Sequence, residues 1–414
     1  MDRAGSLRRT FFSLGIWNFR LYFIGQAISL SGTWMQTIGQ SWLVLQITGS
    51  GTALGFVTAL QFLPILVFGP WGGVIADRFS KRTILYCTQC AAGVLALVLG
   101  VLVATGWVRL WMVAILAVCL GLVNAVDNPT RQTFVLEMVG KEQIQNAVPL
   151  NSVLVNLARV LGPALAGALI ATVGLAACFF VNAASYIAVL IALWMMRAEQ
   201  LHSAPLVARA SGQLREAFRY VRSTPILRNV LLMMAIIGTL SYEFQVILPL
   251  FAQFTLGGGA GAYAALTAAM GVGSVIGGLY TASRRKVVPA MLIRAAFLFG
   301  VVILAAAIAP NLAFAMAALV LVGIFSINFL SLGNTILQLE SVPEMRGRVM
   351  ALWAVAFLGS TPIGGPIVGW IGEHAGPRWG LGLGGLAALI AGTLGFRSLG
   401  LAPAPNAPAR PPGG

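Results

Sequence analysis

Twelve long apolar runs occupy most of this 414-residue chain, and short polar segments separate them. An α-helix needs about 20 mostly apolar residues to cross the hydrocarbon core of a bilayer, and each run reaches that length. Only 9% of the residues are charged, against roughly 25% in soluble domains, so the chain cannot cover itself with a water-facing surface. A soluble enzyme is therefore excluded. The predicted spans are residues 19–46, 50–75, 83–105, 109–130, 147–173, 175–197, 226–252, 262–283, 288–309, 312–336, 347–372 and 379–400.

The two halves of the chain repeat each other. The pair Leu-Glu at 136–137 and the pair Gly-Pro at 162–163 both recur 203 residues later, at 339–340 and 365–366. The fold class we predict is an all-α membrane protein whose twelve transmembrane helices form two pseudo-symmetric six-helix bundles. Its predicted parts are an N-terminal bundle over 1–197, a cytoplasmic linker with an amphipathic helix over 198–225, a C-terminal bundle over 226–400 and a disordered tail over 401–414.

Basic residues predict the orientation. The net charge is +15, and 23 of the 26 Lys and Arg residues fall at the termini or in alternate loops, against two in the loops between them. Because cytoplasmic loops carry an excess of Lys and Arg, both termini are predicted to be cytoplasmic, with the chain in a bacterial inner (plasma) membrane. The charge is explained by this topology and does not indicate nucleic-acid binding.

Within the linker, apolar and basic side chains follow the same helical spacing side by side. This pattern predicts a short amphipathic helix whose apolar side contacts membrane lipids and whose basic side faces anionic headgroups. A solvated run of charges is the alternative. The two sets are Leu214, Phe218 and Val221, and Arg215, Arg219 and Arg222.

The loop after the second span reads Gly-Gly-Val-Ile-Ala-Asp-Arg-Phe-Ser-Lys-Arg over 72–82. Its small residues allow helices to approach closely, and Asp77 can cap a positive helix end. The stretch resembles the signature loop of the major facilitator superfamily, with Ser80 in place of a glycine. The resemblance implies a latch between Asp77 and residues 346–349 when the transporter opens outward; a basic loop with no gating role is the alternative. Its gating residues would be Gly73, Asp77, Arg78, Lys81 and Arg82.

Two elements nearby extend the resemblance. The corresponding loop of the second half has Ala282 at the place of Asp77, so the latch is expected in one half only. Asp127 ends the predicted fourth span, where family members pair a carboxylate with the loop arginine, here Arg78. The resemblance therefore implies an Asp127–Arg78 ion pair at the inner gate, and a loop residue without a partner is the alternative.

Span five resembles the antiporter motif of drug-exporting members, in which a glycine–proline kink shapes the contact between the halves. Together with residues 128–137 and 344–349, this motif makes the chain similar to the branch that includes macrolide-efflux and enterobactin-exporter proteins. The residues that carry the motif are Arg159, Gly162, Pro163 and Gly167.

Ionisable residues inside a span cost at least ~2.5–3.5 kcal/mol on insertion scales, so each needs a reason. Glu243, in the outer half of span seven, is the first candidate for a proton carrier, and Asp127 is the second. Arg159 could attract an anionic substrate group or hold Glu243 ionised. The alternatives are a Glu243 at the headgroup level and an Arg159 bonded to backbone carbonyls.

A polar face on the first span predicts part of a substrate cavity, because residues at i and i+4 share one side of a helix. Polar residues of other spans could complete it, while single aromatic residues in these spans are more often packing than ligand contacts. The cavity candidates are Thr33, Gln36, Gln40, Gln61, Asn156, Gln245 and Asn328.

Neither a catalytic constellation nor a metal-ligand spacing is present, and no phosphate-binding loop of the GxxxxGK[ST] type occurs, so we predict no cofactor and a proton gradient as the energy source. The function we predict is proton-coupled export of a lipophilic drug, a macrolide-like compound or a siderophore by a monomer. An importer or lysolipid flippase on the same fold, and a non-transporting membrane receptor or assembly factor, are the alternatives.

Overall fold

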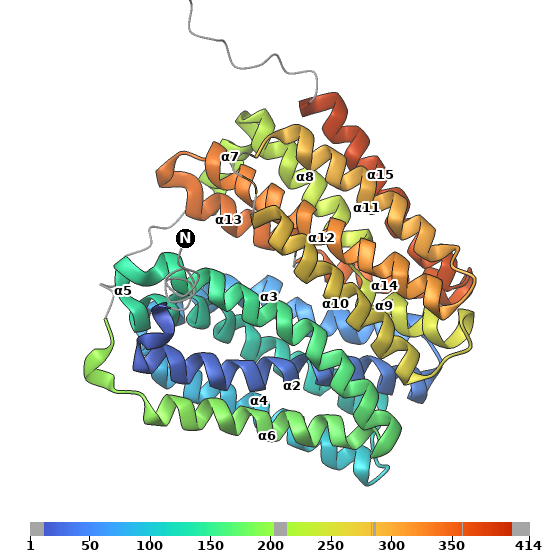
Figure 1. The fold of residues 1–414 in the computed structure, drawn as a ribbon, viewed down its shortest axis with the longest axis horizontal. Coiled ribbons are helices and arrows are strands. Elements are labelled where there is room, and N and C mark those ends of the chain that lie inside the picture. Colours follow the sequence, from blue (N-terminus) through green and yellow to red (C-terminus); the bar gives the residue numbers. More distant parts are fainter. Residues whose placement is uncertain (1–11, 203–212, 283, 285–286, 358, 400–414) are drawn as a thin grey trace, which may run out of the picture.

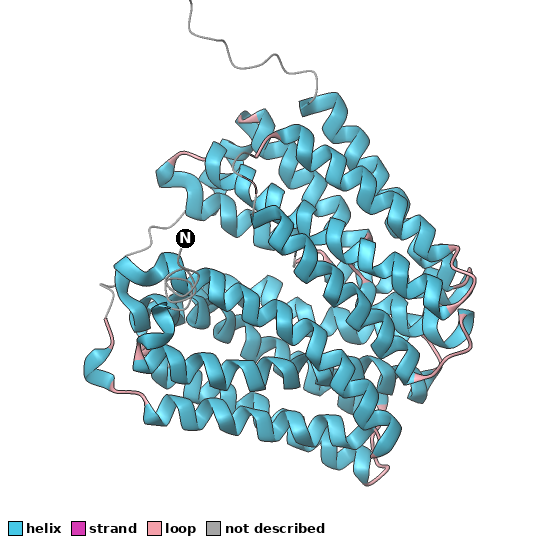
Figure 2. Ribbon diagram, viewed as in Figure 1, coloured by secondary structure: helices cyan, strands magenta, loops and turns pink. Residues whose placement is uncertain are grey.

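The computed structural model describes residues 12–202, 213–282, 284, 287–357 and 359–399, and the predicted tail over 401–414 lies outside them. Helices make up almost all of the described residues, with no strand among them (Figure 2). Eleven helical segments are long and apolar enough to cross a membrane. The apolar side chains that these segments leave exposed, such as Phe56 and Trp194, are suited to a lipid surrounding.

The first half of the chain forms one bundle (Figure 1). The helix over the predicted span 19–46 is not among the eleven apolar segments, because its polar side chains lower its hydropathy. It nevertheless packs along two other helices of the bundle. The elements are η1 (Phe12–Gly15), α2 (Trp17–Thr48), α3 (Gly51–Arg78), α4 (Lys81–Ala104), α5 (Leu110–Thr172), α6 (Leu175–Met195) and η2 (Ala198–Gln200).

Helix α5 contains the fourth and fifth spans, and here the predicted boundaries are wrong. We expected span four to end near residue 130 and a loop to follow, but the helix runs on to Gly140, whose φ of 72° and ψ of 175° interrupt it. The polar residues after position 126 suggested exposure to water. Asp127 and Thr130 instead point into the bundle and are 1% and 0% exposed.

The second half forms the other bundle, and two of its spans are broken (Figure 1). Span seven is interrupted at residues 241–243, and span eleven is interrupted around residues 359–360. Broken helices are common at the functional sites of transporters. The elements are α8 (Pro225–Leu240), α9 (Phe244–Leu250), a π-helical turn η3 (Phe251–Thr255), α10 (Ala260–Ala282), α11 (Pro289–Ala307), α12 (Leu312–Glu340), α13 (Pro343–Phe357), α14 (Thr361–His374) and α15 (Pro377–Leu399).

Helix α7 (Gln213–Ser223) forms within the predicted linker and packs on α8 and α13. Val221 is buried against the protein, whereas Phe218 is 62% exposed. The two therefore do not share one lipid-facing side as the spacing predicts. Glu216 accepts a hydrogen bond from Arg348 of α13 at 2.5 Å, which fixes the helix to span eleven. The side chains of Leu214 and Arg215 lie outside the described residues.

The two bundles lie close together at one end and diverge toward the other (Figure 1). We call the end where the turn at 49–50 meets the last turn of α14 the closed end, and the end that carries α7 and the start of α13 the open end. The contact depends on small residues: a Cβ atom on Gly55 of α3 would lie 2.3 Å from the carbonyl oxygen of Gly365 in α14. One turn away, a Cβ atom on Gly369 would lie 2.2 Å from the Gly51 carbonyl oxygen.

A single carboxylate also joins the bundles at the closed end. Glu373 of α14 accepts hydrogen bonds from the Ser50 hydroxyl at 2.7 Å and from the Thr52 backbone N–H at 2.9 Å. Ser50 is the N-cap of α3 and its hydroxyl in turn accepts from the Ala53 N–H at 3.1 Å. The acid of one bundle thus lies at the positive N-terminal end of a helix in the other.

We predict that Gly55→Ala shifts the protein toward an arrangement in which the two bundles are separated at the closed end. The added methyl group cannot fit against Gly365, and overpacking of this kind costs about 1–3 kcal/mol. Spin labels on exposed Gln46 and His374, in a background without the four native cysteines, should show a larger population at long distance.

Gly278→Ala is the matched control, since a Cβ atom there meets nothing within 4 Å. An unchanged distance distribution in Gly55→Ala would contradict the role assigned to this contact.

Candidate functional site

A small polar cavity of about 70 Å³, partly open to solvent, lies inside the first bundle. Its walls come from helices α2 to α6, and among the described residues of the second half Gln245 of α9 also lines it. Of the predicted cavity residues, Thr33, Gln36, Gln40, Gln61 and Gln245 line it. The further polar residues that line it are Ser29, Thr37, Ser41, Thr58, Gln89, Asn124, Asp127, Arg131, Asn182 and Tyr186.

Two predicted cavity residues lie elsewhere. Asn156 donates to the Ser152 carbonyl oxygen one turn before it on α5, at 2.9 Å. Asn328 of α12 is buried against α10, where it accepts a hydrogen bond from Thr281. Each is explained by local hydrogen bonding, so polarity inside a span was not sufficient to assign a side chain to the cavity.

The cavity face of α2 satisfies its own polar groups with partners inside the bundle. The hydroxyl of Thr33 donates to the Ser29 carbonyl oxygen one turn back, at 2.9 Å. Gln36 accepts from the Asn182 amide at 2.6 Å, and Gln40 donates to Gln61 at 3.0 Å. Amide side chains keep further donor and acceptor capacity after one such bond. The wall is therefore able to bind a hydroxyl, amide or carboxylate group.

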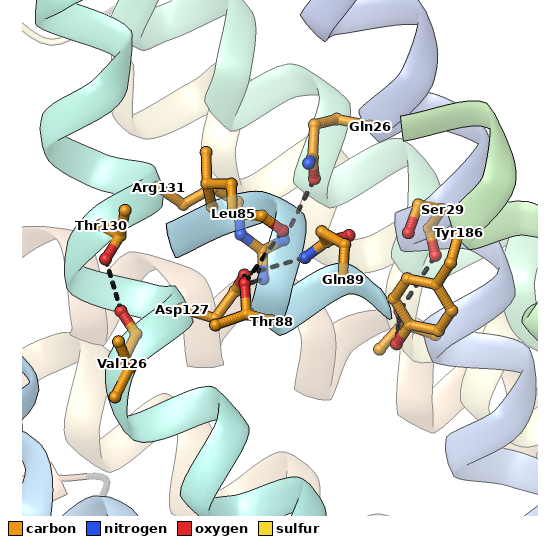
Figure 3. Close-up of polar contacts among 11 residues, drawn as sticks. Gln26, Ser29, Leu85, Thr88, Gln89, Val126, Asp127, Thr130, Arg131 and Tyr186 are labelled. Carbon is orange, nitrogen blue, oxygen red and sulfur yellow. Dashed lines mark hydrogen bonds and ion pairs between the residues drawn. The ribbon is translucent and has the colours of Figure 1, made fainter. Parts of the chain in front are cut away.

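An ion pair between neighbouring turns of α5 lies at the cavity wall (Figure 3). Asp127 pairs with Arg131, and its Oδ1 atom accepts from the Thr88 hydroxyl at 2.7 Å and from the Gln89 amide at 2.8 Å. Arg131 also donates to Gln26 of α2 at 3.1 Å. Three helices, α2, α4 and α5, therefore meet at one ion pair.

The expected pair between Asp127 and Arg78 is wrong. Asp127 lies more than three helical turns before the end of span four at Gly140, and Arg131 one turn away neutralises it. Arg78, at the end of α3, is exposed. The prediction failed because it placed Asp127 at the membrane surface.

The signature loop is held by its lysine and by its second arginine. Lys81 donates to Glu137 of α5 at 2.5 Å, with both side chains mostly buried. Arg82 donates to the carbonyl oxygens of Leu193 and Trp194 in α6. At the start of the motif, a Cβ atom on Gly72 would lie 2.0 Å from the Ala125 carbonyl oxygen, so α3 and α5 pack backbone to backbone there. The side chain of Asp77 lies outside the described residues.

The antiporter-like motif contacts both bundles. Gly162 packs on α2, where a Cβ atom would lie 2.4 Å from Trp34 Cβ, whereas Gly167 faces Ala264 of the second half. The backbone dihedral angles stay helical at Gly162 and Pro163. The contact between the halves near this motif comes from Gly167 and from the backbone of Arg159.

Arg159 does not pair with Glu243 as we had considered. Its guanidinium lies over the Trp34 ring, 5.1 Å from the centroid, and its Nε atom has no hydrogen-bond partner among the described residues. Its backbone carbonyl faces Gly271 of α10. Arg159 therefore lies at the junction of the two bundles rather than on the cavity wall.

Glu243 occupies the break between α8 and α9 and is 3% exposed. Its Oε1 atom has no hydrogen-bond partner among the described residues. A Cβ atom on Gly364 of α14 would lie 2.9 Å from that oxygen. Glu243 is therefore enclosed by protein rather than exposed on the surface of the bundle.

Comparison with known proteins adds the family context. The family model described as "Transmembrane secretion effector" matches residues 9–406. The staphyloferrin A transporter of Staphylococcus aureus is 24% identical over 346 residues, which cover 80% of this chain and 84% of that protein. The enterobactin exporter of Citrobacter koseri is 24% identical over 92% of both chains. The multidrug efflux pump Tap of Mycolicibacterium fortuitum is 25% identical over 83% of this chain and 88% of that pump.

Solved structures agree on the fold. A bacterial homologue of the lysosomal transporter Spinster, inward-facing and unoccupied, superposes with a TM-score of 0.70 at 16% identity, covering 92% of this chain and 96% of that one. The nucleoside transporter NupG gives a TM-score of 0.72 at 12% identity, covering 93% and 98%. The predicted fold class and the resemblance to exporters of this superfamily are confirmed.

We predict that Lys81→Met lowers the thermal stability of the purified protein more than Arg78→Met does. Lys81→Met leaves the mostly buried Glu137 carboxylate without its partner, at a cost of about 1.5–3 kcal/mol, whereas Arg78 is exposed. Melting temperatures in one detergent measure the difference. Equal losses in the two variants would show that the Lys81–Glu137 pair does not hold the loop.

Proposed function

We propose that this chain, which belongs to the transmembrane secretion effector family of major facilitator transporters, exports a small organic molecule from the cytoplasm by alternating access driven by protons. It is a transporter and not an enzyme. The observation that carries the proposal is the polar cavity inside one bundle of a two-bundle fold. Both bundles belong to one chain, which supports a monomer as the working unit.

The arrangement of the bundles supports an inward-facing state. The open end carries the linker helix α7 and the loops rich in Lys and Arg (Figure 1), and such loops are cytoplasmic in bacterial membranes. The closed end then faces outward, with both termini in the cytoplasm. Rocking of the halves about the cavity would separate α3 from α14 and open the cavity to the outside.

The chemistry of the cavity supports a cargo rich in hydrogen-bonding groups. The lining is dominated by hydroxyl and amide side chains with one ion pair, whereas sites for lipophilic compounds are lined mainly by apolar and aromatic side chains. Two of the relatives carry siderophores in their names, staphyloferrin A and enterobactin. We therefore favour a siderophore or a comparably polar molecule over a lipophilic drug.

Glu243 is the residue to which we assign proton coupling. It lies at a helix break, buried, with one unpartnered oxygen. One side of α14 faces this carboxyl group through Gly364, and Gly365 in the next position packs on Gly55 of the other bundle. A charge on Glu243 is poorly solvated there, so gain or loss of its proton would alter the packing of α14 at the closed end.

We predict that deleting the gene makes cells retain the cargo. The measurement is a profile of metabolites inside cells and in the medium, in the deletion strain with and without the restored gene. At least one polar compound should accumulate inside and disappear from the medium. A compound depleted inside the cells would support import instead, and an unchanged profile would contradict transport of an endogenous metabolite.

We predict that Glu243→Gln reduces proton-driven export at least tenfold in proteoliposomes, because a neutral amide cannot carry the proton. Exchange of cargo without a proton gradient should remain, since the cavity is intact. Glu199→Gln, at an exposed acid of η2, is the matched control. Undiminished proton-driven export by Glu243→Gln would overturn the assignment.

A further inference from the structure

Arg131 and Asp127 both line the cavity, but their side chains differ in exposure. The side chain of Arg131 is 22% exposed, while that of Asp127 is 1% exposed. The Arg131 side chain is thus the more exposed of the two, while the carboxylate is covered. Among the described residues these are the two charged side chains that line the cavity, so the cation is the more open of the two to an incoming ion.

Asp127 does not depend on Arg131 alone. Its Oδ1 atom accepts two hydrogen bonds, from Thr88 and Gln89 of α4, and Oδ2 faces the guanidinium (Figure 3). If Arg131 turned to another anion, two donors would still hold the carboxylate. Arg131, for its part, carries five N–H donors and bonds two side chains here, Asp127 and Gln26. The pair is therefore built so that the guanidinium can change partners.

Each of two buried side-chain amides beside the ion pair has one polar atom without a hydrogen-bond partner among the described residues. The Oε1 atom of Gln89 and the Nε2 atom of Gln26 have no hydrogen bond among the described residues. Gln26 is 1% exposed and Gln89 is 3% exposed. Buried polar atoms are rarely left unpaired, so one acceptor and one donor next to the guanidinium indicate a site for a polar ligand.

We propose that Arg131 is the anion-binding residue of the cavity and docks a carboxylate of the cargo, with Asp127 as its counter-ion in the empty transporter. This rests on the proposed function and names the cargo class: a carboxylic acid with a hydroxyl or amide group nearby. Gln89 would accept from that hydroxyl or amide, and Gln26 would donate to the acid. When the cargo leaves, the Asp127–Arg131 pair forms again, so the buried cation is paired throughout the cycle.

The other described groups that lie near the pair do not offer a competing charge. Tyr22 of α2 and Tyr186 of α6 lie within electrostatic range of Arg131, and phenol hydroxyls are neutral near neutral pH. A cationic cargo would have to displace the guanidinium from a carboxylate that is already covered. The geometry therefore favours an acid.

The test uses the full-length transporter in detergent, titrated with tricarballylate, a small tricarboxylate, at constant ionic strength. Its trimethyl ester is the neutral control. A ligand that binds the folded state stabilises it by RT ln(1 + [L]/Kd), so the rise of the melting temperature with ligand concentration gives an apparent Kd. Wild-type protein should be stabilised by the acid and not by the ester.

The variants should move in opposite directions. Arg131→Gln should weaken acid binding by about tenfold or more, since a charge-assisted contact is lost, and Arg131→Lys should restore part of it. Asp127→Asn should strengthen acid binding several-fold, because the competing carboxylate is gone. Arg109→Gln, an exposed arginine at the N-cap of the same helix, should bind like wild type. A purely structural role would weaken binding in both Asp127→Asn and Arg131→Gln.

Each remaining outcome is decisive. The proposal is overturned if the acid stabilises neither the wild type nor Asp127→Asn, or if Arg131→Gln and Arg131→Lys, eluting as single monodisperse peaks, bind the acid unchanged. Cells carrying Arg131→Gln distinguish a failure of the anion-site proposal from a failure of the proposed export. If the deletion strain retains a metabolite that Arg131→Gln cells still export, the anion site is refuted and the proposed export is not. If the deletion strain retains no metabolite, export itself is refuted.

Discussion

Polar groups inside a lipid-embedded helix need partners within the protein, and the first bundle is organised by that requirement. Helix α2 carries hydroxyl and amide side chains along its inner face. Amide side chains of neighbouring helices form hydrogen bonds with them, as between Gln36 and Asn182 and between Gln40 and Gln61. A buried carboxylate and a buried guanidinium satisfy each other on α5. Hydrogen bonds inside a bundle thus create the walls of the cavity and leave surplus donors and acceptors facing it.

The contact between the bundles follows a different rule. At the closed end α3 and α14 approach so closely that glycine backbones touch. Lipid supplies no hydrophobic force to press helices together, so close backbone packing is a main source of attraction in a membrane. Such a flat contact can part without unthreading side chains. A fold whose halves must separate and meet again in each cycle benefits from an interface of this kind.

Sequence reasoning recovered the architecture because apolar runs and basic loops are direct consequences of the bilayer. It also found most of one cavity wall, since the spacing of Thr33, Gln36 and Gln40 places them on one side of a helix. It misplaced Asp127, because a polar stretch within a long helix reads like a loop when depth in the bundle is unknown. Nor could it assign Arg131 to the cavity, because it counted this residue as part of a loop, whereas Arg131 lies inside helix α5.

Residues from separate parts of the chain could not be paired by pattern alone. Glu137 meets Lys81 across 56 residues, and Glu216 meets Arg348 across 132. In each case the sequence offered several acids and bases of equal standing. Packing of α4 on α5, and of α7 on α13, selects among them. Tertiary contacts of this length carry no local signature, so the three-dimensional arrangement was needed.

Glu373 of the second bundle forms part of the N-terminal cap of α3, a helix of the first bundle. When the bundles part, α3 must exchange that carboxylate for water, and the loss of an acid at a helix end is worth only about 0.3–1 kcal/mol. That amount corresponds to a few-fold change in population. This one contact of the closed end is therefore comparable to thermal energy, and dissolved ions can compete for both of its partners. The balance between joined and separated bundles at that end should then vary with the salt concentration of the solution it faces.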